Sequence, residues 1–325
     1  MPQPTPVLYG HIELIAGTAH PELAEEIANY LTAKRGSHIQ LADIEISKFA
    51  NDNIFVRLGS SVRGQDVYVV QTTSRPVNDN LMELLITLDT LKRDSAGRIT
   101  AVVPYLCYGR SDKKDLPRVP ITARLVADMI QVAGADRYMT IDLHAGQIQG
   151  FFSIPGDVLT AFHMLSDYFL YKQLEDAVIV AADLGFAKQG RNWAHKLDTP
   201  MAFIEKRRTG TTTKALKLVG DVRDKNVIIV DDEVDTAGTL CNAIEVVSGA
   251  GARSIHLAFT HGVFSKDALE KLSKADVEEI VFTNTIPLAT EDRLSNMTIL
   301  SVSELLSEVI LRAHEGRSVG ELFHE

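Results

Sequence analysis

The sequence predicts an α/β protein of two similar domains, each a mainly parallel β-sheet flanked by helices. Short apolar, β-branched segments alternate along the chain with segments of helical periodicity. The strand-like segments are nearly continuous in apolar character, which is typical of strands buried on both faces, as in parallel sheets. At 325 residues the chain is long enough for two domains with substantial cores.

Nine segments have the length and composition of buried strands. In chain order they are residues 12–17, 66–71, 98–106, 137–143, 176–183, 200–206, 226–232, 254–262 and 279–286. Nine strands would be unusual in one open sheet, and residues 151–160 interrupt the pattern with Pro155 and Gly156. We therefore predict an N-terminal domain over residues 1–160 and a C-terminal domain over residues 161–325. The last ~15 residues are a candidate to pack back on the N-terminal domain.

Two of the intervening helices can be described in detail. In residues 76–93, Asn78 or Asn80 is available as a cap, and in residues 120–134, Pro120 can open the helix and Gly134 can end it. The apolar stripe of the first helix is Leu81, Leu84, Leu85, Leu88 and Leu91, and that of the second is Ile121, Leu125, Met129 and Ala133.

The composition excludes several classes of function. A formal net charge of -10 argues against a nucleic-acid or anionic-membrane binder, because both need a basic face. No apolar run approaches the ~18 residues of a membrane span. The start of the chain lacks the basic region and apolar core of a signal peptide. Cys107 and Cys241 have no metal-type spacing and are expected to be free and buried. We expect a cytoplasmic protein without nucleic-acid or membrane partners.

The segment VIIVDDEVDTAGTL, from Val227 to Leu240, gathers carboxylates directly after an apolar run. Neighbouring carboxylates repel one another, so folding alone gives no reason to cluster them. Val227 to Val230 can form a buried strand, with the acidic residues in the turn that leads into a helix. In open α/β sheets, ligands bind at the carboxyl ends of the strands. The cluster therefore indicates a binding site.

The two halves of this segment suit the two ends of a sugar phosphate. Thr236 and Thr239 offer hydroxyl donors, and Gly238 lacks the Cβ that would keep a phosphate from the helix N-terminus. Asp231 and Asp232 could accept hydrogen bonds from sugar hydroxyls. An Asp-rich loop that only caps a helix stays open as the alternative.

The sequence VIIVDDEVDTAGT resembles the ribose-5-phosphate-binding signature of the type I phosphoribosyltransferase fold. That resemblance alone leaves two reactions open, the use of phosphoribosyl pyrophosphate by a phosphoribosyltransferase and its synthesis. TIDLHAGQIQGFF, residues 140–152, is similar to a signature of the ribose-phosphate pyrophosphokinases that the transferases lack. Residues 60–71, 76–85 and 108–127 also resemble that family. The likeness extends over nearly the full length of the chain.

The resemblance implies transfer of the β,γ-diphosphoryl group of ATP to the 1-hydroxyl of ribose 5-phosphate, with release of AMP. It also implies Mg²⁺ as cofactor and a homo-oligomer, usually a hexamer. The nucleotide would lie on the N-terminal domain and ribose 5-phosphate on the C-terminal domain. Two alternatives stay open, a base phosphoribosyltransferase and a non-catalytic subunit associated with a synthetase. A base phosphoribosyltransferase would give no role to His144. A non-catalytic subunit usually has altered catalytic loops.

Several site residues follow from the resemblance. His144 and Asp183 match the family's Mg²⁺ positions, and Asp183 is the easier ligand because Mg²⁺ prefers oxygen. Lys206 matches the active-site lysine and Arg208 the arginine of a catalytic loop. Residues 209–215 have the small, polar composition of a loop that orders on substrate binding. The positions that match ribose-5-phosphate contacts are Arg208, Asp231, Asp232, Asp235, Thr236, Ala237, Gly238 and Thr239.

The ATP and regulatory residues also follow from it. Phe49 offers a stacking face for adenine and Arg110 a cation for phosphate. Asn53 stands where the family has Glu and Ser111 where it has Gln, so we expect ATP to be the best donor but with looser discrimination. The ATP-binding candidates are Phe49, Asn51, Asp52, Asn53, Arg110 and Ser111. Candidates for a phosphate/ADP regulatory site are Ser61, Arg63, Gln149 and Ser318.

Overall fold

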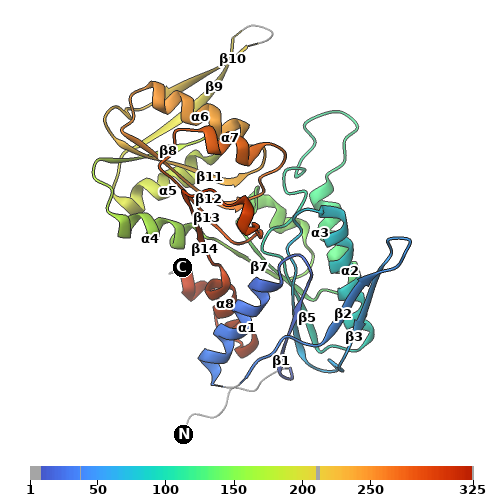
Figure 1. The fold of residues 1–325 in the computed structure, drawn as a ribbon. Helices are drawn as coiled ribbons and strands as arrows, with labels where there is room; N and C mark the ends of the chain where they lie inside the picture. Colours follow the sequence, from blue (N-terminus) through green and yellow to red (C-terminus); the bar gives the residue numbers. More distant parts are fainter. Residues whose placement is uncertain (1–8, 37, 210–212, 324–325) are drawn as a thin grey trace. The chain divides into compact units, whose positions relative to one another are not determined.

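The computed structural model describes residues 9–36, 38–209 and 213–323, with the backbone alone at 206–209, 213–215 and 323 (Figure 1). The chain divides into two compact units, Met1–Leu159 with Ser301–Glu325, and Thr160–Leu300. This division lies next to the predicted boundary after residue 160. The returning segment starts at Ser301, earlier than the last ~15 residues considered from the sequence.

The first unit is built on a five-stranded, wholly parallel sheet in the order β1-β4-β5-β6-β7. Its strands are β1 (Ile12–Ala16), β4 (Asp66–Val70), β5 (Arg98–Val102), β6 (Arg137–Ile141) and β7 (Gly156–Leu159). The first four were predicted, whereas β7 lies within the segment interpreted as an interruption. Gly156 is required there because a Cβ would lie 2.0 Å from Cε1 of Tyr138 on the neighbouring strand.

Four α-helices cover this sheet in the described part of the unit. They are α1 (Pro21–Arg35), α2 (Val77–Arg93), α3 (Thr122–Ala133) and α8 (Ser303–Glu315). Helices α2 and α3 bury their apolar faces with Val67, Val69 and Ala101 of the sheet. Tyr68 points to the opposite face, where its hydroxyl donates to the carbonyl of Ile310 on α8. Helix α8 packs on α1, and the Tyr30 hydroxyl lies within hydrogen-bond distance of the carboxylates of Glu304 and Glu308, at 3.1 and 2.9 Å.

The predicted cap of α2 is wrong, although its stripe is confirmed. The N-cap position is Pro76, with no side-chain cap. Asn80 lies inside the helix and donates to the carbonyl of Ser74 at 2.8 Å, while Asn78 accepts from the Tyr108 hydroxyl at 2.6 Å. The buried leucines are Leu81, Leu84, Leu88 and Leu91, with Leu85 half-buried.

The predicted stripe of α3 is wrong, although Gly134 follows the helix as expected. The buried residues are Ala123, Val126, Ala127 and Ile130. The helix is apolar on more than one side, and its face with two alanines permits close approach to its neighbours. Leu125 is 55% exposed. It lines a shallow groove with Leu85, Met129 and Val132.

A two-stranded antiparallel hairpin of β2 (Ile44–Lys48) and β3 (Ile54–Leu58) projects from the first unit (Figure 1). The first unit also contains the short 3-10 turns η1 (Gly146–Phe151) and η4 (Gly320–Phe323). Among the described residues, no helix of either unit is long and apolar enough to span a membrane. Both cysteines are free as predicted; Cys107 is buried and Cys241 is half-buried.

The second unit is built on a seven-stranded sheet in the order β10-β9-β8-β11-β12-β13-β14. All neighbouring strands are parallel except β10, which pairs with β9 in the antiparallel sense. The strands are β8 (Ala177–Ala181), β9 (Met201–Thr209), β10 (Thr213–Val219), β11 (Asn226–Val234), β12 (Ser254–Gly262), β13 (Glu279–Thr283) and β14 (Met297–Leu300). The helices are α4 (Phe162–Lys172), α5 (Ala187–Leu197), α6 (Gly238–Gly249) and α7 (Ala268–Lys274), with short turns η2 (Leu184–Phe186) and η3 (Thr290–Asp292).

The prediction of a loop over residues 209–215 is wrong at both ends, because strands of this sheet extend into the segment. Strand β9 continues to Thr209 and β10 begins at Thr213, with Thr209 and Thr213 in register. Threonine favours strands, which explains why this polar segment can extend the hairpin on both sides. Residues 210–212 lie outside the described part of the chain.

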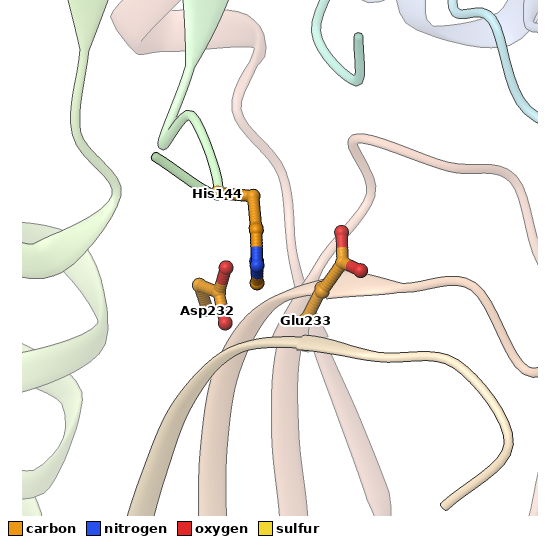
Figure 2. A group of neighbouring side chains, drawn as sticks. All are labelled: His144, Asp232 and Glu233. Carbon is orange, nitrogen blue, oxygen red and sulfur yellow. The ribbon is translucent and has the colours of Figure 1, made fainter. Parts of the chain in front are cut away.

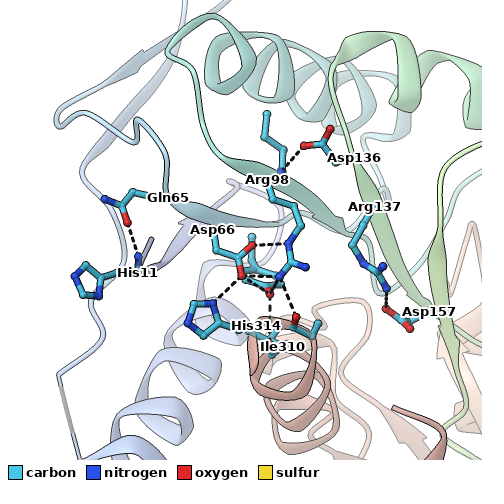
Figure 3. A network of polar contacts seen from close by, with 12 residues as sticks. His11, Gln65, Asp66, Arg98, Asp136, Arg137, Asp157, Ile310 and His314 are labelled. Carbon is cyan, nitrogen blue, oxygen red and sulfur yellow. Dashed lines mark hydrogen bonds and ion pairs between the residues drawn. The ribbon is translucent and has the colours of Figure 1, made fainter. Parts of the chain in front are cut away.

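A buried ionic network fixes α8 to the sheet of the first unit (Figure 3). Asp66, fully buried on β4, accepts from Nε and Nη2 of Arg98 at 2.7 and 2.6 Å. It also accepts from the Tyr68 hydroxyl at 3.0 Å and contacts Nδ1 of His314 at 2.8 Å. Nη2 of Arg98 donates in addition to the carbonyl of Ala313. Burial opposes the ionised form of Asp66, but the bonds from His314 and Arg98 outweigh it and lower its pKa.

Replacing Asp66 by Asn should lower the free energy of unfolding by roughly 3 kcal/mol or more, because Arg98 would keep a buried, uncompensated charge. Because the pKa of Asp66 is lower in the folded than in the unfolded protein, ionised Asp66 contributes its full stability above the unfolded-state pKa. This contribution is lost as the pH falls through the folded-state pKa. The difference in free energy of unfolding between parent and variant should therefore shrink as pH falls below about 5. Denaturant unfolding at several pH values measures this difference. Asp89→Asn, which breaks the exposed Arg93 pair, is the control and should cost under about 1 kcal/mol. A pH-independent gap would contradict this assignment.

Candidate functional site

Carboxylates gather at the carboxyl ends of two neighbouring strands of the second unit. Strands β8 and β11 are parallel and pair Ala181 with Val230. Asp183 follows β8, so it reaches the same edge of the sheet as Asp231 and Asp232. Asp183 also accepts a hydrogen bond from the backbone N–H of Phe186 at 3.1 Å, which fixes its loop.

The acidic run itself belongs to the strand and not to the turn, which corrects the sequence interpretation. Strand β11 continues through Val234, and Asp231 and Glu233 pair in register with Phe259 and His261 of β12. Successive side chains of a strand point to opposite faces. Nevertheless, a carboxylate oxygen of Asp232 and one of Glu233 lie within 4.8 Å of each other at the end of the strand (Figure 2). Asp232 is half-buried and Glu233 is buried.

The electrostatics of this edge favour a cation or a hydrogen-bond donor. Burial raises the pKa of Asp231 well above its ordinary value, and the nearby charges of Asp232 and Asp183 raise it further. The backbone N–H of Asp232 donates to Oδ1 of Asp231 at 2.9 Å, which opposes that shift only in part. Such mutual repulsion is relieved by a bound divalent ion or by sugar hydroxyls that donate to the carboxylates.

An alanine stands at the N-cap position where the turn after β11 enters α6. This residue, Ala237, has the left-handed conformation at φ 57° and forms no side-chain cap itself. The alternative of an Asp-rich loop that caps the helix stays open. A Cβ added to Gly238 would meet only the Oγ1 of Thr236, at 3.8 Å. Packing within the protein does not explain this glycine, whereas an anion approaching the helix N-terminus does.

In the first unit, two candidate loops lie together. A Cβ on Gly109 would lie 3.5 Å from Cβ of His144, so the loop of Arg110 and the segment after β6 are adjacent. Nε2 of Gln147, on η1, donates to the buried carboxylate of Asp112. Sequence reasoning missed this link, because nothing in the spacing of Asp112 and Gln147 indicates that they meet. His144 and Arg110 are both exposed (Figure 2 draws His144).

The nucleotide candidates of the hairpin dock on the same end of α2 as the Arg110 loop. Lys48 pairs with Asp79 at 2.6 Å, and the neighbouring Asn78 accepts from the Tyr108 hydroxyl. The turn Phe49–Asn53 lies between β2 and β3, and Asn53 accepts from the N–H of Phe49 at 2.9 Å. It presents Asn51, Asp52 and Asn53 to solvent. Phe49 is 56% exposed and meets the ring of Phe55 in an edge-to-face arrangement, so exposed ring surface is available for stacking.

Ser111 lies in the Arg110 loop but supports helix α3. Its carbonyl accepts from the N–H of Ala123 at 3.2 Å, and its hydroxyl lies 3.4 Å from that of Thr122. These contacts add a structural role to the residue proposed for the nucleotide.

The remaining candidates are placed only in part. Lys206 and Arg208 lie on β9 opposite Leu216 and Lys214, but their side chains lie outside the described residues. Ser61, Arg63, Gln149 and Ser318 are exposed and lie on three separate segments of the first unit. Their regulatory assignment stays a prediction.

The second unit thus combines a mainly parallel sheet with an acidic edge beside a helix N-terminus, which defines the chain as an α/β protein with a candidate ligand site at the carboxyl ends of its strands. Two family models match the chain. Residues 12–134 match the N-terminal domain of ribose phosphate pyrophosphokinase, and residues 206–324 match a phosphoribosyl synthetase-associated domain.

Individual proteins match over almost the whole chain. Ribose-phosphate pyrophosphokinases of Caldanaerobacter subterraneus subsp. tengcongensis and Wolinella succinogenes are 47% and 46% identical, and each match covers 96% of this chain and 98% of the relative. The crystal structure of phosphoribosylpyrophosphate synthetase from Mycobacterium smegmatis matches with a TM-score of 0.88 at 41% identity. It covers 94% of this chain and 100% of that one.

The chain belongs to the ribose-phosphate pyrophosphokinase family and is an enzyme. The predicted fold class and family are confirmed. The full-length relatives are named as pyrophosphokinases, which decides against a base phosphoribosyltransferase and against a non-catalytic subunit.

Replacing Gly238 by Ala should weaken ribose 5-phosphate binding at least about tenfold, because the methyl group occupies the space for the phosphate. The free energy of unfolding should change by less than about 1 kcal/mol, since alanine suits a helix. Calorimetric titration and denaturant unfolding measure the two effects. The control is Gly249→Ala at the other end of α6, where a Cβ meets no atom within 4 Å. Unchanged affinity in Gly238→Ala would show that the phosphate lies elsewhere.

Proposed function

We propose that the enzyme transfers the β,γ-diphosphoryl group of ATP to the 1-hydroxyl of ribose 5-phosphate. The products are 5-phosphoribosyl 1-pyrophosphate, a precursor in nucleotide biosynthesis, and AMP. The 1-hydroxyl oxygen attacks the β-phosphorus, the bond from this phosphorus to the oxygen shared with the α-phosphate breaks, and the hydroxyl proton is released. The observation that carries the proposal is the acidic end of β11 followed directly by the turn into α6, whose N-cap residue is the left-handed Ala237.

The acceptor half follows from the geometry of this turn. The 5-phosphate lies at the N-terminus of α6, where the backbone N–H groups and the hydroxyls of Thr236 and Thr239 donate to it. Asp231 and Asp232 accept hydrogen bonds from the ribose hydroxyls. Anchoring both ends of the sugar orients the 1-hydroxyl and lowers the entropic cost of the reaction.

The nucleotide half is proposed for the first unit. The exposed face of Phe49 stacks on the adenine, and Asn51, Asp52 and Asn53 bind its polar edge. Arg110 contacts the phosphates. The exposure of Phe49 and the docking of both loops at α2 support this assignment. Lys206 and Arg208 supply cations that stabilise the charge of the transferred group.

The family implies Mg²⁺, and the donor set of the second unit fits it. Asp183, Asp231 and Asp232 offer the carboxylate oxygens that Mg²⁺ prefers, and their mutual repulsion favours a cation. We propose Asp183 as a ligand, with His144 as the second position carried over from the family. When bound, Mg²⁺ neutralises phosphate charge and so makes the β-phosphorus easier to attack.

We extend the proposal to a cytoplasmic homo-oligomer, a hexamer as the family resemblance implies. No nucleic-acid partner is proposed for a chain of net charge -10.

The direct test incubates the pure protein with Mg²⁺, ribose 5-phosphate and each nucleoside triphosphate in turn, and follows the products by phosphorus NMR. We expect AMP and 5-phosphoribosyl 1-pyrophosphate from ATP. Release of ADP, or no new phosphorus signal, would overturn the proposal.

Lys206→Ala should lower kcat by on the order of 10²–10³, the usual loss for one preorganised charge in the transition state. Lys217→Ala is the matched control, because Lys217 is an exposed lysine on the same hairpin. Its turnover should match that of the parent. If Lys206→Ala keeps turnover within about a factor of two, Lys206 does not act on the transferred group.

A further inference from the structure

The turn between β11 and α6 is held from one side by the segment that follows β12. The backbone N–H groups of Val263 and Phe264 both donate to the carbonyl of Val234, at 2.9 and 3.0 Å. The N–H of Ser265 donates to the carbonyl of Asp235 at 2.8 Å. These bonds tie two consecutive carbonyl groups, at the end of β11 and the start of the turn, to the segment that follows β12.

The next carbonyl of the turn is held by a side chain. Nζ of Lys271, on helix α7, donates to the carbonyl of Thr236 at 3.3 Å. The same ammonium group pairs with Asp267, one helical turn earlier, at 2.9 Å. Its side chain is 40% exposed. Lys271 therefore approaches the turn from the side of α7 with its orientation set by Asp267.

Holding the carbonyl groups decides where the amide groups of the turn point. In a trans peptide the C=O of one residue and the N–H of the next are directed oppositely. With the carbonyls of Val234, Asp235 and Thr236 directed to the β12–α7 side, the N–H groups of the three following residues are directed away from it. They add to the N–H groups of the first turn of α6, which have no partner within the helix itself. The result is a concave row of donors suited to a phosphate.

The conformation of Ala237 makes this support necessary. Its φ of 57° is left-handed, which a residue with a Cβ adopts only at a cost. Such conformations persist where surrounding contacts over-determine them. The Thr236 carbonyl belongs to the peptide that precedes Ala237, so the bond from Lys271 acts directly on the strained residue.

We propose that Lys271 is a positioning residue for phosphate recognition: it holds the Thr236 carbonyl so that the Ala237 amide faces the 5-phosphate of the sugar. It also places a positive charge behind the phosphate turn. The residue contacts no substrate, and its role rests on the proposed function, in which ribose 5-phosphate occupies this turn.

Lys271→Ala should raise KM for ribose 5-phosphate and its calorimetric Kd about tenfold, the effect of losing one hydrogen bond from a charged donor. kcat and KM for ATP should stay within about a factor of two, because the lysine does not touch the reacting groups. Lys271→Arg keeps a cationic donor and should restore most of the affinity. A general loss of structure would change all of these parameters together and would not be rescued by arginine.

Lys274→Ala is the matched control. Lys274 lies on the same helix and pairs with Glu270 at 2.6 Å in the same i, i+4 geometry, and its side chain is 71% exposed against 40% for Lys271. The affinity of the Lys274→Ala variant for ribose 5-phosphate should equal that of the parent. If Lys271→Ala does not fold, Lys271→Gln, which keeps the stem and loses the charge, takes its place in the comparison.

The outcomes separate this inference from the proposed function. If the parent neither binds ribose 5-phosphate nor turns over, the proposed function fails. If the parent is active and the Lys271 and Lys274 variants bind ribose 5-phosphate alike, the positioning role of Lys271 is wrong while the proposed function stands. A raised KM for both substrates would also overturn the positioning role.

Discussion

The parallel pairing of β8, β11 and β12 is the constraint on which the proposed acceptor site depends. Parallel strands end at one edge, so Asp183 after β8, the acidic residues of β11 and the segment after β12 meet without being near in sequence. The strands are buried on both faces, which fixes their register and therefore the heights of these groups. The rigidity of the sheet is what allows a turn with a left-handed alanine to keep one conformation.

Two opposite electrostatic environments lie within a few residues of each other at this edge. Asp231 and Asp232 repel one another and Asp183, whereas the N-terminus of α6 carries the positive end of a helix dipole. Neither the clustered carboxylates nor the helix N-terminus stabilises the folded protein when no ligand is bound. A ribose phosphate suits both at once, because its hydroxyl groups donate hydrogen bonds and its phosphate accepts them. The same logic explains why a glycine without a packing role stands at position 238.

The sequence predicted the nine principal strands, because their apolar runs are buried on both faces. It missed β7, where Gly156 suggested a break but makes room for the Tyr138 ring. It missed β10 although Leu216, Lys217 and Leu218 alternate as in an edge strand, because the threonine-rich composition beside them favoured a loop. The acidic cluster could be predicted because neighbouring carboxylates repel one another and so indicate a binding role. The hydrogen bond from Lys271 to Thr236 could not be predicted, since a half-exposed lysine on a short helix has no characteristic sequence pattern and the contact depends on tertiary structure.

The central claim is that the end of β11 binds ribose 5-phosphate and not the nucleotide. Calorimetric titration of the parent and of the Asp231→Asn, Asp232→Asn double variant, with ribose 5-phosphate and separately with ATP, tests it most directly. The variant loses charged acceptors for the sugar hydroxyls, and such bonds contribute roughly 1.5–3 kcal/mol each. The account predicts that ribose 5-phosphate binding weakens at least about tenfold more than ATP binding. Equal weakening of both ligands, or a larger effect on ATP, would contradict it.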